Sequence, residues 1–133
     1  MTRRERFNAA HRLWVDQYTK EQNYELFGKC ANPHFHGHNF ELFVTVKGSP
    51  DPKLGWIMNV KDLGTVIKEK VVNVLDHSNL NLDPNFLPDG VQPTIETMVY
   101  YIWKELEPHI HPAQLHCVKI CETENIYAEY FGE

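Results

Sequence analysis

Two histidines spaced two residues apart, His36 and His38, are the feature of the sequence best suited to chemistry. Side chains alternate along a β-strand, so both imidazoles should project from the same face. Gly37 between them has no side chain and would let another backbone approach closely. His11 lies in a second strand-like segment and could supply a third nitrogen. Three neutral imidazoles suit zinc, and a site with three protein ligands keeps its fourth position open for catalysis.

Other interpretations of the histidines stay open. A His-x-His pair is more often structural than metal-binding, and a single histidine such as His11 is commonly a core residue. His34 shares strand parity with the pair, but Pro33 and Phe35 favour a loop, so we expect that His34 is not a ligand. The three histidines near the C-terminus have no convincing partner and fit surface or core positions: His109, His111 and His116.

Cys30 lies in a loop-like segment shortly before the histidine pair. A thiol becomes reactive when nearby cations, a metal or a histidine stabilise the thiolate. Lys29, the expected zinc site and His77 could each do so. Two alternatives remain: an inert buried thiol, or a fourth zinc ligand, which would close the site and make it structural.

Asp76 and His77 follow the last apolar turn of a helical pattern. A carboxylate can fix the tautomer of a neighbouring imidazole and raise its basicity, which makes the pair a possible proton relay. The alternative is an ordinary helix C-terminus, where the dipole favours a histidine.

A second set of polar residues could bind a ligand. Glu122 shares strand parity with Val118 and Ile120, so its carboxylate needs a partner, either a protein group or a ligand. Thr94 and Glu96 begin a helical pattern, where capping alone would explain both.

The elements that must position these residues follow from hydrophobic periodicity. Alternation predicts strands at residues 5–13 and 38–47, and a short strand at 55–58. An amphipathic stripe through Val74 and Leu75 predicts a helix that Asn59 caps, and a second helix runs from Thr94 to Pro108. Residues 21–27 suggest one helical turn, and residues 78–93 a long loop. Two final strands cover about 114–122 and 126–131.

The order of the expected strands and helices along the chain predicts an α+β fold in which two helices cover one face of a mainly antiparallel sheet. The 133 residues fit a single domain, residues 1–133.

With 13 Lys and Arg against 18 Asp and Glu, the formal charge of −5 does not suit a nucleic-acid binder. No apolar run is long enough to span a membrane. Three sparse cysteines and an N-terminus without an apolar leader lead us to expect a cytoplasmic protein.

Six short motifs, in this order and spacing, resemble the 6-pyruvoyl-tetrahydropterin synthase family. They extend over nearly the whole chain and are Phe7–Leu13, Phe27–Cys30, His36–Phe40, Leu75–His77, Pro93–Glu96 and Cys121–Thr123. The resemblance implies the T-fold (tunnelling fold), in which sheets of neighbouring chains join into a barrel. It also implies a homo-oligomer, usually a hexamer made of two stacked trimers, with sites that draw residues from more than one subunit.

The resemblance also assigns roles to residues. It gives the zinc ligands as His11, His36 and His38. It gives the catalytic group as Cys30 with the relay Asp76 and His77. It gives the pterin-anchoring carboxylate as Glu122, with Thr94 and Glu96 lining the pterin pocket. For the triphosphate of the substrate, the nearest cations by sequence are Arg12 and Lys29.

The family has three branches that differ in product. One converts 7,8-dihydroneopterin triphosphate to 6-pyruvoyl-tetrahydropterin and releases triphosphate, on the way to tetrahydrobiopterin. A second makes 6-carboxy-tetrahydropterin from the same substrate, releasing acetaldehyde and triphosphate for queuosine biosynthesis. A third has glutamate in place of the cysteine. Cys30 disfavours the third branch, and the five residues between Cys30 and His36 favour the first.

Two functions of other classes remain as alternatives. A zinc-stabilised binding module would have no catalytic activity and would unfold when the metal is removed. A hydrolase that uses a zinc-bound hydroxide would not need Cys30.

Overall fold

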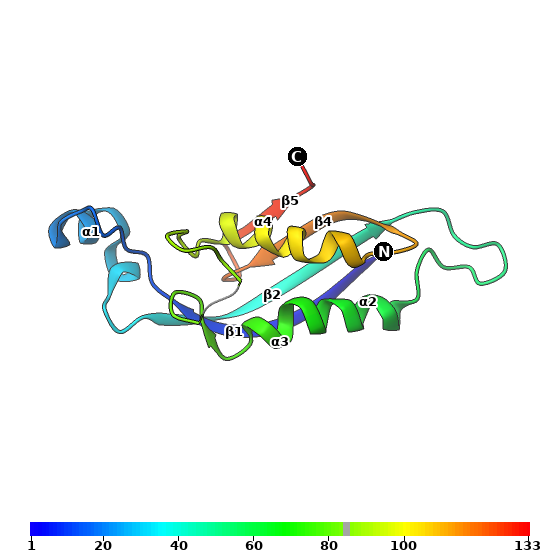
Figure 1. Ribbon diagram of the computed structural model, residues 1–133, viewed down its shortest axis with the longest axis horizontal. Helices are drawn as coiled ribbons and strands as arrows, with labels where there is room; N and C mark the ends of the chain where they lie inside the picture. The colour runs from blue at the N-terminus through cyan, green and yellow to red at the C-terminus, as the bar shows by residue number, and fades with distance from the viewer. Residues whose placement is uncertain (84–85) are drawn as a thin grey trace.

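The computed structural model describes residues 1–83 and 86–133. Five strands form one sheet in the order β3-β1-β2-β4-β5. They are β1 (Thr2–His11), β2 (His36–Lys47), β3 (Ser78–Asn79), β4 (Gln114–Cys121) and β5 (Tyr127–Tyr130). The sheet is mixed, because β3 pairs parallel to β1 while the other pairs are antiparallel. The sheet does not close on itself, so both of its edges stay open (Figure 1).

Two helical segments cover one face of this sheet, as the sequence predicts (Figure 1). The first runs through α2 (Val60–Ile67), the π-helical η2 (Lys68–Val72) and α3 (Asn73–Leu75), and the second is α4 (Ile95–Leu106), which continues into η3 (Glu107–His109). The expected caps are confirmed: the Asn59 side chain accepts the N–H of Lys61, and the Thr94 hydroxyl accepts the N–H of Thr97.

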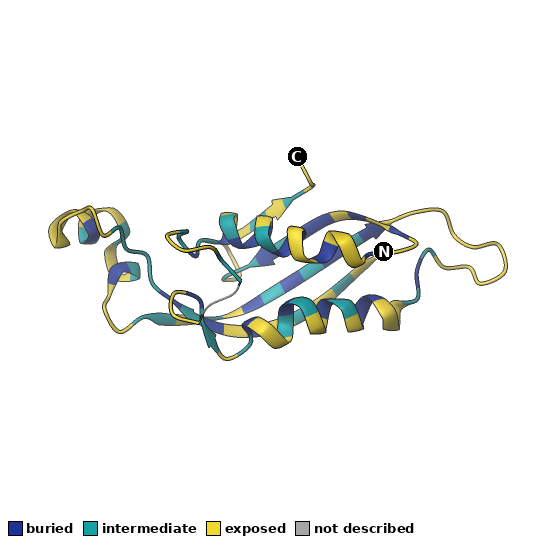
Figure 2. Cartoon of the chain, in the orientation of Figure 1, coloured by how far each residue is buried: buried dark blue, intermediate teal, exposed yellow. Residues whose placement is uncertain are grey.

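The core lies between these helices and the sheet (Figure 2). Alternate residues of β1 and β2 point into it, and Phe7 stacks on Phe40 with ring centroids 5.1 Å apart. The fully buried members with the largest side chains include Phe40, Leu42, Leu63, Ile67, Leu75, Met98, Ile102, Leu106 and Ile120. No helix within residues 1–83 and 86–133 is long and apolar enough to cross a bilayer.

The π-helical turn η2 explains why the buried residues of the first helical segment are spaced four residues apart. Leu63, Ile67, Val71 and Leu75 are all buried, whereas Val74, which the expected stripe includes, is exposed. In a straight α-helix, steps of four residues drift by about 40° each, so Leu75 would rotate away from the core. A wider π turn absorbs much of this drift. Leu75 therefore stays in the core, and the residues that follow it leave the helix at a fixed point beside β1.

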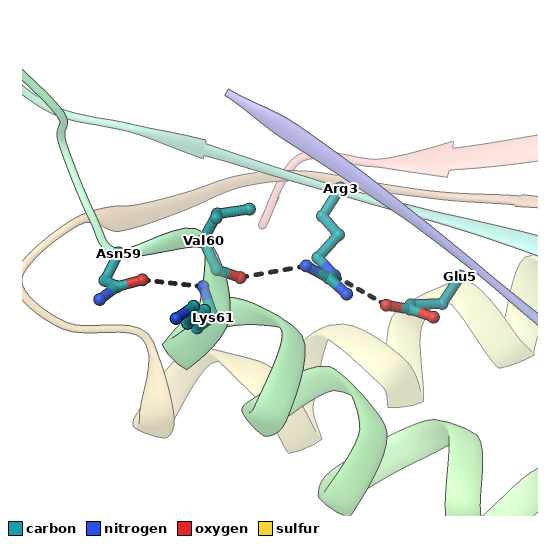
Figure 3. Close-up of polar contacts among 5 residues, drawn as sticks. All are labelled: Arg3, Glu5, Asn59, Val60 and Lys61. Atoms are coloured by element: carbon teal, nitrogen blue, oxygen red, sulfur yellow. Dashed lines mark hydrogen bonds and ion pairs between the residues drawn. The ribbon is translucent and has the colours of Figure 1, made fainter.

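The N-terminal half of β1 is attached to α2 through Arg3 (Figure 3). The Arg3 Nε donates to the Glu5 carboxylate at 2.7 Å, and an Nη donates to the carbonyl of Val60 at 3.2 Å. Gly64 of α2 provides the space, because a Cβ there would lie 2.6 Å from the Arg3 guanidinium carbon. A larger residue at this position would therefore displace the Arg3 guanidinium from its present contacts.

The short strand expected at residues 55–58 is wrong, because this segment is a loop without strand pairing. Asp51 organises the turn before it: its carboxylate accepts the N–H groups of Lys53 and Leu54. Gly55 has a positive φ of 75°, which a strand does not allow. The polar segment at residues 17–29 contains more helix than the single turn expected. The helix α1 (Lys20–Phe27) is followed directly by the 3-10 helix η1 (Gly28–Ala31).

Candidate metal centre and active site

The register of β1 and β2 brings the three candidate zinc ligands together. His11 is paired directly with His36, and Ala9 with His38. Strand alternation turns the three imidazoles to the face that the helices cover. Their ring centroids are 4.6 Å apart for His11 and His36, and 5.0 Å for each of the other two pairs.

The three rings have the nitrogen atoms that a metal needs. One ring nitrogen from each of His11, His36 and His38 lies within 4.8 Å of the other two. His11 is buried and the other two are partly buried. The Nε2 atoms of all three have no hydrogen-bond partner, and neither does the Nδ1 of His36. Buried polar atoms without a partner are costly, and a metal ion would satisfy one nitrogen of each ring. The residues therefore fit a divalent metal that prefers nitrogen ligands.

A backbone carbonyl fixes the tautomer of His11. The Nδ1 of His11 lies 2.8 Å from the carbonyl oxygen of Pro93, so Nδ1 carries the proton and donates it there. The Nε2 lone pair is then directed at the other two rings. This is the arrangement typical of metal-binding histidines, whose second nitrogen donates to a carbonyl or carboxylate. Sequence reasoning missed Pro93, because no residue type signals a role that its backbone performs.

The electrostatic environment keeps these imidazoles neutral. Burial lowers the pKa of His11, His36 and His38, since it disfavours the charged ring. The neighbouring rings lower the pKa further, because two imidazolium ions so close would repel. Neutral imidazoles can bind a cation without first losing a proton.

Glu122 lies beside this cluster, at the end of β4. One of its carboxylate oxygens is 3.2 Å from the Nε2 of His38, within ion-pair distance but without the geometry of a hydrogen bond, and both side chains are mostly buried. The Glu122 backbone N–H donates to the carbonyl of Ile126 at 3.0 Å, which fixes the turn into β5. Glu122 also lines a cavity together with Asn39 and Thr123. Its carboxylate could therefore accept hydrogen bonds from a ligand bound next to the metal centre.

Cys30 lies in η1 and is attached to the residues that follow His11. The backbone N–H of Leu13 donates to the carbonyl of Cys30 at 2.9 Å. The thiol is partly exposed and unpaired. Among the described residues, the side chains close enough to share one metal are the three histidines, and Cys30 is not in this group. This placement favours the interpretation with an open fourth ligand position.

The Asp76–His77 pair lies at the outer edge of β1, beside Asn8. The Asp76 carboxylate accepts the backbone N–H of Asn8 at 2.9 Å and lies 2.9 Å from the Nδ1 of His77. The backbone hydrogen bond from Asn8 lowers the pKa of Asp76, and His77 lowers it further. His77 has a positive φ of 61° and donates its own N–H to the Asn8 carbonyl. The pair is thus rigidly oriented, with the His77 ring 78% exposed.

The remaining candidates from the sequence are Thr94, Glu96 and His34. Thr94 caps α4 directly after Pro93, and Glu96 is exposed in the first turn of that helix. His34 lies in the loop before β2 and is outside the group of three histidines that could hold a metal. Cys30 and His77 make no hydrogen bond with each other in the part of the chain that the structure describes.

Comparison with known proteins gives the family of the chain. A family model described as 6-pyruvoyl tetrahydropterin synthase matches residues 1–133. The chain belongs to the 6-pyruvoyl tetrahydropterin synthase family. It is 41% identical to the 6-pyruvoyl tetrahydrobiopterin synthase of Homo sapiens over 133 residues, which cover all of this chain and 91% of that protein.

Two further relatives agree with this family membership. The 6-pyruvoyl tetrahydrobiopterin synthase of Dictyostelium discoideum is 42% identical over 133 residues, covering all of this chain and 96% of that protein. The structure of the Caenorhabditis elegans 6-pyruvoyl tetrahydropterin synthase superposes with a TM-score of 0.90 at 34% identity, covering the whole chain and 94% of its own. The T-fold expected from the sequence is confirmed, and the family relatives identify the chain as an enzyme of the pterin synthase type.

Proposed function

We propose that this chain is a zinc-dependent lyase that converts 7,8-dihydroneopterin triphosphate to 6-pyruvoyl-tetrahydropterin and releases triphosphate. The observation that carries the proposal is the group of three histidines whose Nε2 atoms make no hydrogen bond, with the Cys30 thiol outside that group and the Glu122 carboxylate 3.2 Å from His38. The names of the relatives favour the pyruvoyl product. The spacing of five residues between Cys30 and His36 favours it as well, and Cys30 itself disfavours the branch that has glutamate.

His11, His36 and His38 would hold the zinc ion. The chemistry that zinc supplies in such a site is Lewis-acid polarisation of the substrate's side-chain hydroxyl groups. The second nitrogen of His11 remains bonded to Pro93, which keeps the ring oriented whether or not substrate is present.

Cys30 would act as the base that removes protons from the side-chain carbons of the substrate. Asp76 and His77 would relay protons, with the Asp76 carboxylate orienting the His77 ring. Electrons pass from the side chain to the pterin ring of the same molecule, so no redox cofactor is needed. Triphosphate then leaves by elimination.

Glu122 would bind the guanidine-like edge of the pterin through paired hydrogen bonds to a carboxylate. Thr94 and Glu96 would line the same pocket from the start of α4. Anchoring the ring in this way fixes the side chain relative to the metal and the base, which is the main requirement for an intramolecular reaction of this kind.

The complete site would form only in an oligomer. Within one chain, the Asp76–His77 pair lies at the β1 edge and lines an open cavity with Asn39 of β2, and the His77 ring is exposed enough to meet a neighbouring subunit. The open sheet edges support association into a barrel, and exposed apolar residues at the β5 edge support it further: Ile126, Tyr127 and Phe131. We expect a hexamer built from two trimers. The three unpaired cysteines suit a reducing cytoplasm.

The 6-carboxy-tetrahydropterin product of the queuosine branch is the second candidate, because it arises from the same substrate. The test is to incubate zinc-loaded protein with 7,8-dihydroneopterin triphosphate and to identify the products by mass. We expect 6-pyruvoyl-tetrahydropterin with triphosphate. Acetaldehyde with 6-carboxy-tetrahydropterin would instead assign the chain to the queuosine branch. Absence of pterin binding would favour a zinc-stabilised module, and turnover that survives Cys30→Ala would favour a hydrolase.

A further inference from the structure

The segment that follows β1 carries the backbone from His11 toward the Cys30 loop. Side-chain amides, rather than a neighbouring strand, hold this segment in place. Asn81 accepts the N–H of Arg12 and donates to its carbonyl, both at 2.8 Å. Gln92 makes the same pair of contacts with Trp14, at 3.1 and 2.6 Å. Residues 12–14 therefore form a fixed platform next to the metal centre.

The side chain of Arg12 connects this platform to the loop that bears Cys30. Its Nε donates to the carbonyl of Ala31 at 2.8 Å, and Ala31 is fully buried. The adjacent contact is the bond from the Leu13 N–H to the carbonyl of Cys30. The Arg12 guanidinium also lies over the Trp14 ring, 4.0 Å from its centroid. Two neighbouring carbonyls of the loop are thus held by two neighbouring residues of the platform.

The surroundings of Arg12 do not suit a phosphate. The cavity that Arg12 and Trp14 line also contains the carboxylates of Asp16, Asp83 and Asp89. A triphosphate placed there would meet three negative charges for one positive charge, which is repulsive. The expectation that Arg12 binds the triphosphate therefore has little support from its position.

We propose that Arg12 is a positioning residue that holds the Cys30 thiol at its working distance from the metal centre. The inference rests on the proposed role of Cys30 as the catalytic base. A base that shifts by about 1 Å can lose about 100-fold in rate, although substrate still binds. Arg12 follows β1, and Cys30 lies in η1. Within residues 1–83 and 86–133, two hydrogen bonds join residues 12–14 to η1, so loss of the Arg12 bond would leave the Leu13 bond alone.

The test compares Arg12→Gln, Arg12→Lys and the exposed control Lys20→Gln, which also removes one positive charge. Three quantities are measured on each full-length protein: zinc content, the steady-state kcat and KM, and the rate of Cys30 alkylation by iodoacetamide in the absence of substrate. Alkylation is assigned to each cysteine by peptide mass, so that Cys121, which is also partly exposed, is an internal control.

We expect Arg12→Gln to keep zinc and to lower kcat about 100-fold, with KM changed less than about threefold. Cys30 alkylation should accelerate at least about threefold because the loop opens more often, while Cys121 stays unchanged. Arg12→Lys should recover part of kcat, since an ammonium group can donate to the same carbonyl. Lys20→Gln should match the wild type in every quantity.

Two results would overturn the proposal. A raised KM with unchanged kcat would make Arg12 a substrate ligand, and an unchanged Cys30 alkylation rate would show that Arg12 does not hold the loop. If Arg12→Gln fails to fold, Arg12→Lys must show a smaller change in the same direction. The alkylation measurement needs no turnover, so it tests Arg12 even if the wild-type chain does not convert the pterin.

Discussion

Single residues determine whether the histidine group can hold a metal. His36 and His38 follow from the two-residue spacing, because strand alternation must place both rings on one face. His11 could be predicted only as a candidate, since its approach depends on the register between two strands. The Pro93 carbonyl that fixes its tautomer could not be predicted, because any residue type has a carbonyl and only the folded chain brings this one within 2.8 Å.

The role of Cys30 leads to a prediction that separates catalysis from metal binding. Cys30→Ala should lower turnover of dihydroneopterin triphosphate at least about 100-fold, because the proposed base is removed. Its zinc content should equal that of the wild type, because the thiol is outside the group of metal-binding side chains. Cys121→Ala is the matched control and should retain both. Loss of zinc from Cys30→Ala, measured by atomic absorption, would make the thiol a ligand instead.

Asp76 gives a prediction on pH. Its pKa in the folded protein is lowered below 3.8, so the folded state binds this proton less readily than the unfolded chain does. The stabilisation by its carboxylate is therefore fully present above that value, and it is lost as the pH falls through the lowered pKa. The difference in free energy of unfolding between wild type and Asp76→Asn, both metal-free, should shrink below pH 3.8. Urea titrations would measure it, and a difference independent of pH would contradict the assignment.

At the scale of elements, hydrophobic periodicity predicted both helices, both long strands and both helix caps. It failed at residues 55–58, where apolar residues imitate a strand but Asp51 and Gly55 impose a turn. It also misplaced Val74, because the π-helical turn is not visible in a pattern that assumes 3.6 residues per turn. That turn matters for the site, since it sets where the chain leaves the helix to present Asp76 and His77.

The contact between Arg3 and Glu5 within β1 can be tested by a double-mutant cycle (Figure 3). Their side chains are 28% and 15% exposed, so solvent screens the pair only in part. We expect a coupling energy of about 1 kcal/mol between Arg3→Met and Glu5→Gln in urea unfolding. Arg3→Met alone should cost more than the coupling, because the contact with the Val60 carbonyl is lost as well. A coupling energy near zero would show that the contact does not stabilise the fold.

At the scale of the whole molecule, we propose that the open-edged sheet associates with the sheets of other copies of the chain. Hydrophobic periodicity predicted its strands and helices but not where the site residues lie relative to one another: Cys30 lies in η1, and His77 lies beside Asn8 of β1. We expect the protein in solution to have six times the chain mass of 15.6 kDa by light scattering. Tyr127→Lys, at the open β5 edge, should reduce that mass because a charge opposes edge pairing. The control Leu54→Lys, in the exposed loop after β2, should not, and a monomeric wild type would contradict the shared site.

The central claim is that three imidazoles hold one zinc ion while the Cys30 thiol stays unbound. X-ray absorption at the zinc edge of the loaded protein tests it most directly, because nitrogen and sulfur ligands differ in distance. We predict nitrogen neighbours at about 2.0–2.1 Å and no sulfur in the first coordination shell. A sulfur neighbour at about 2.3 Å would contradict the account, since Cys30 would then close the site and could not act as its base.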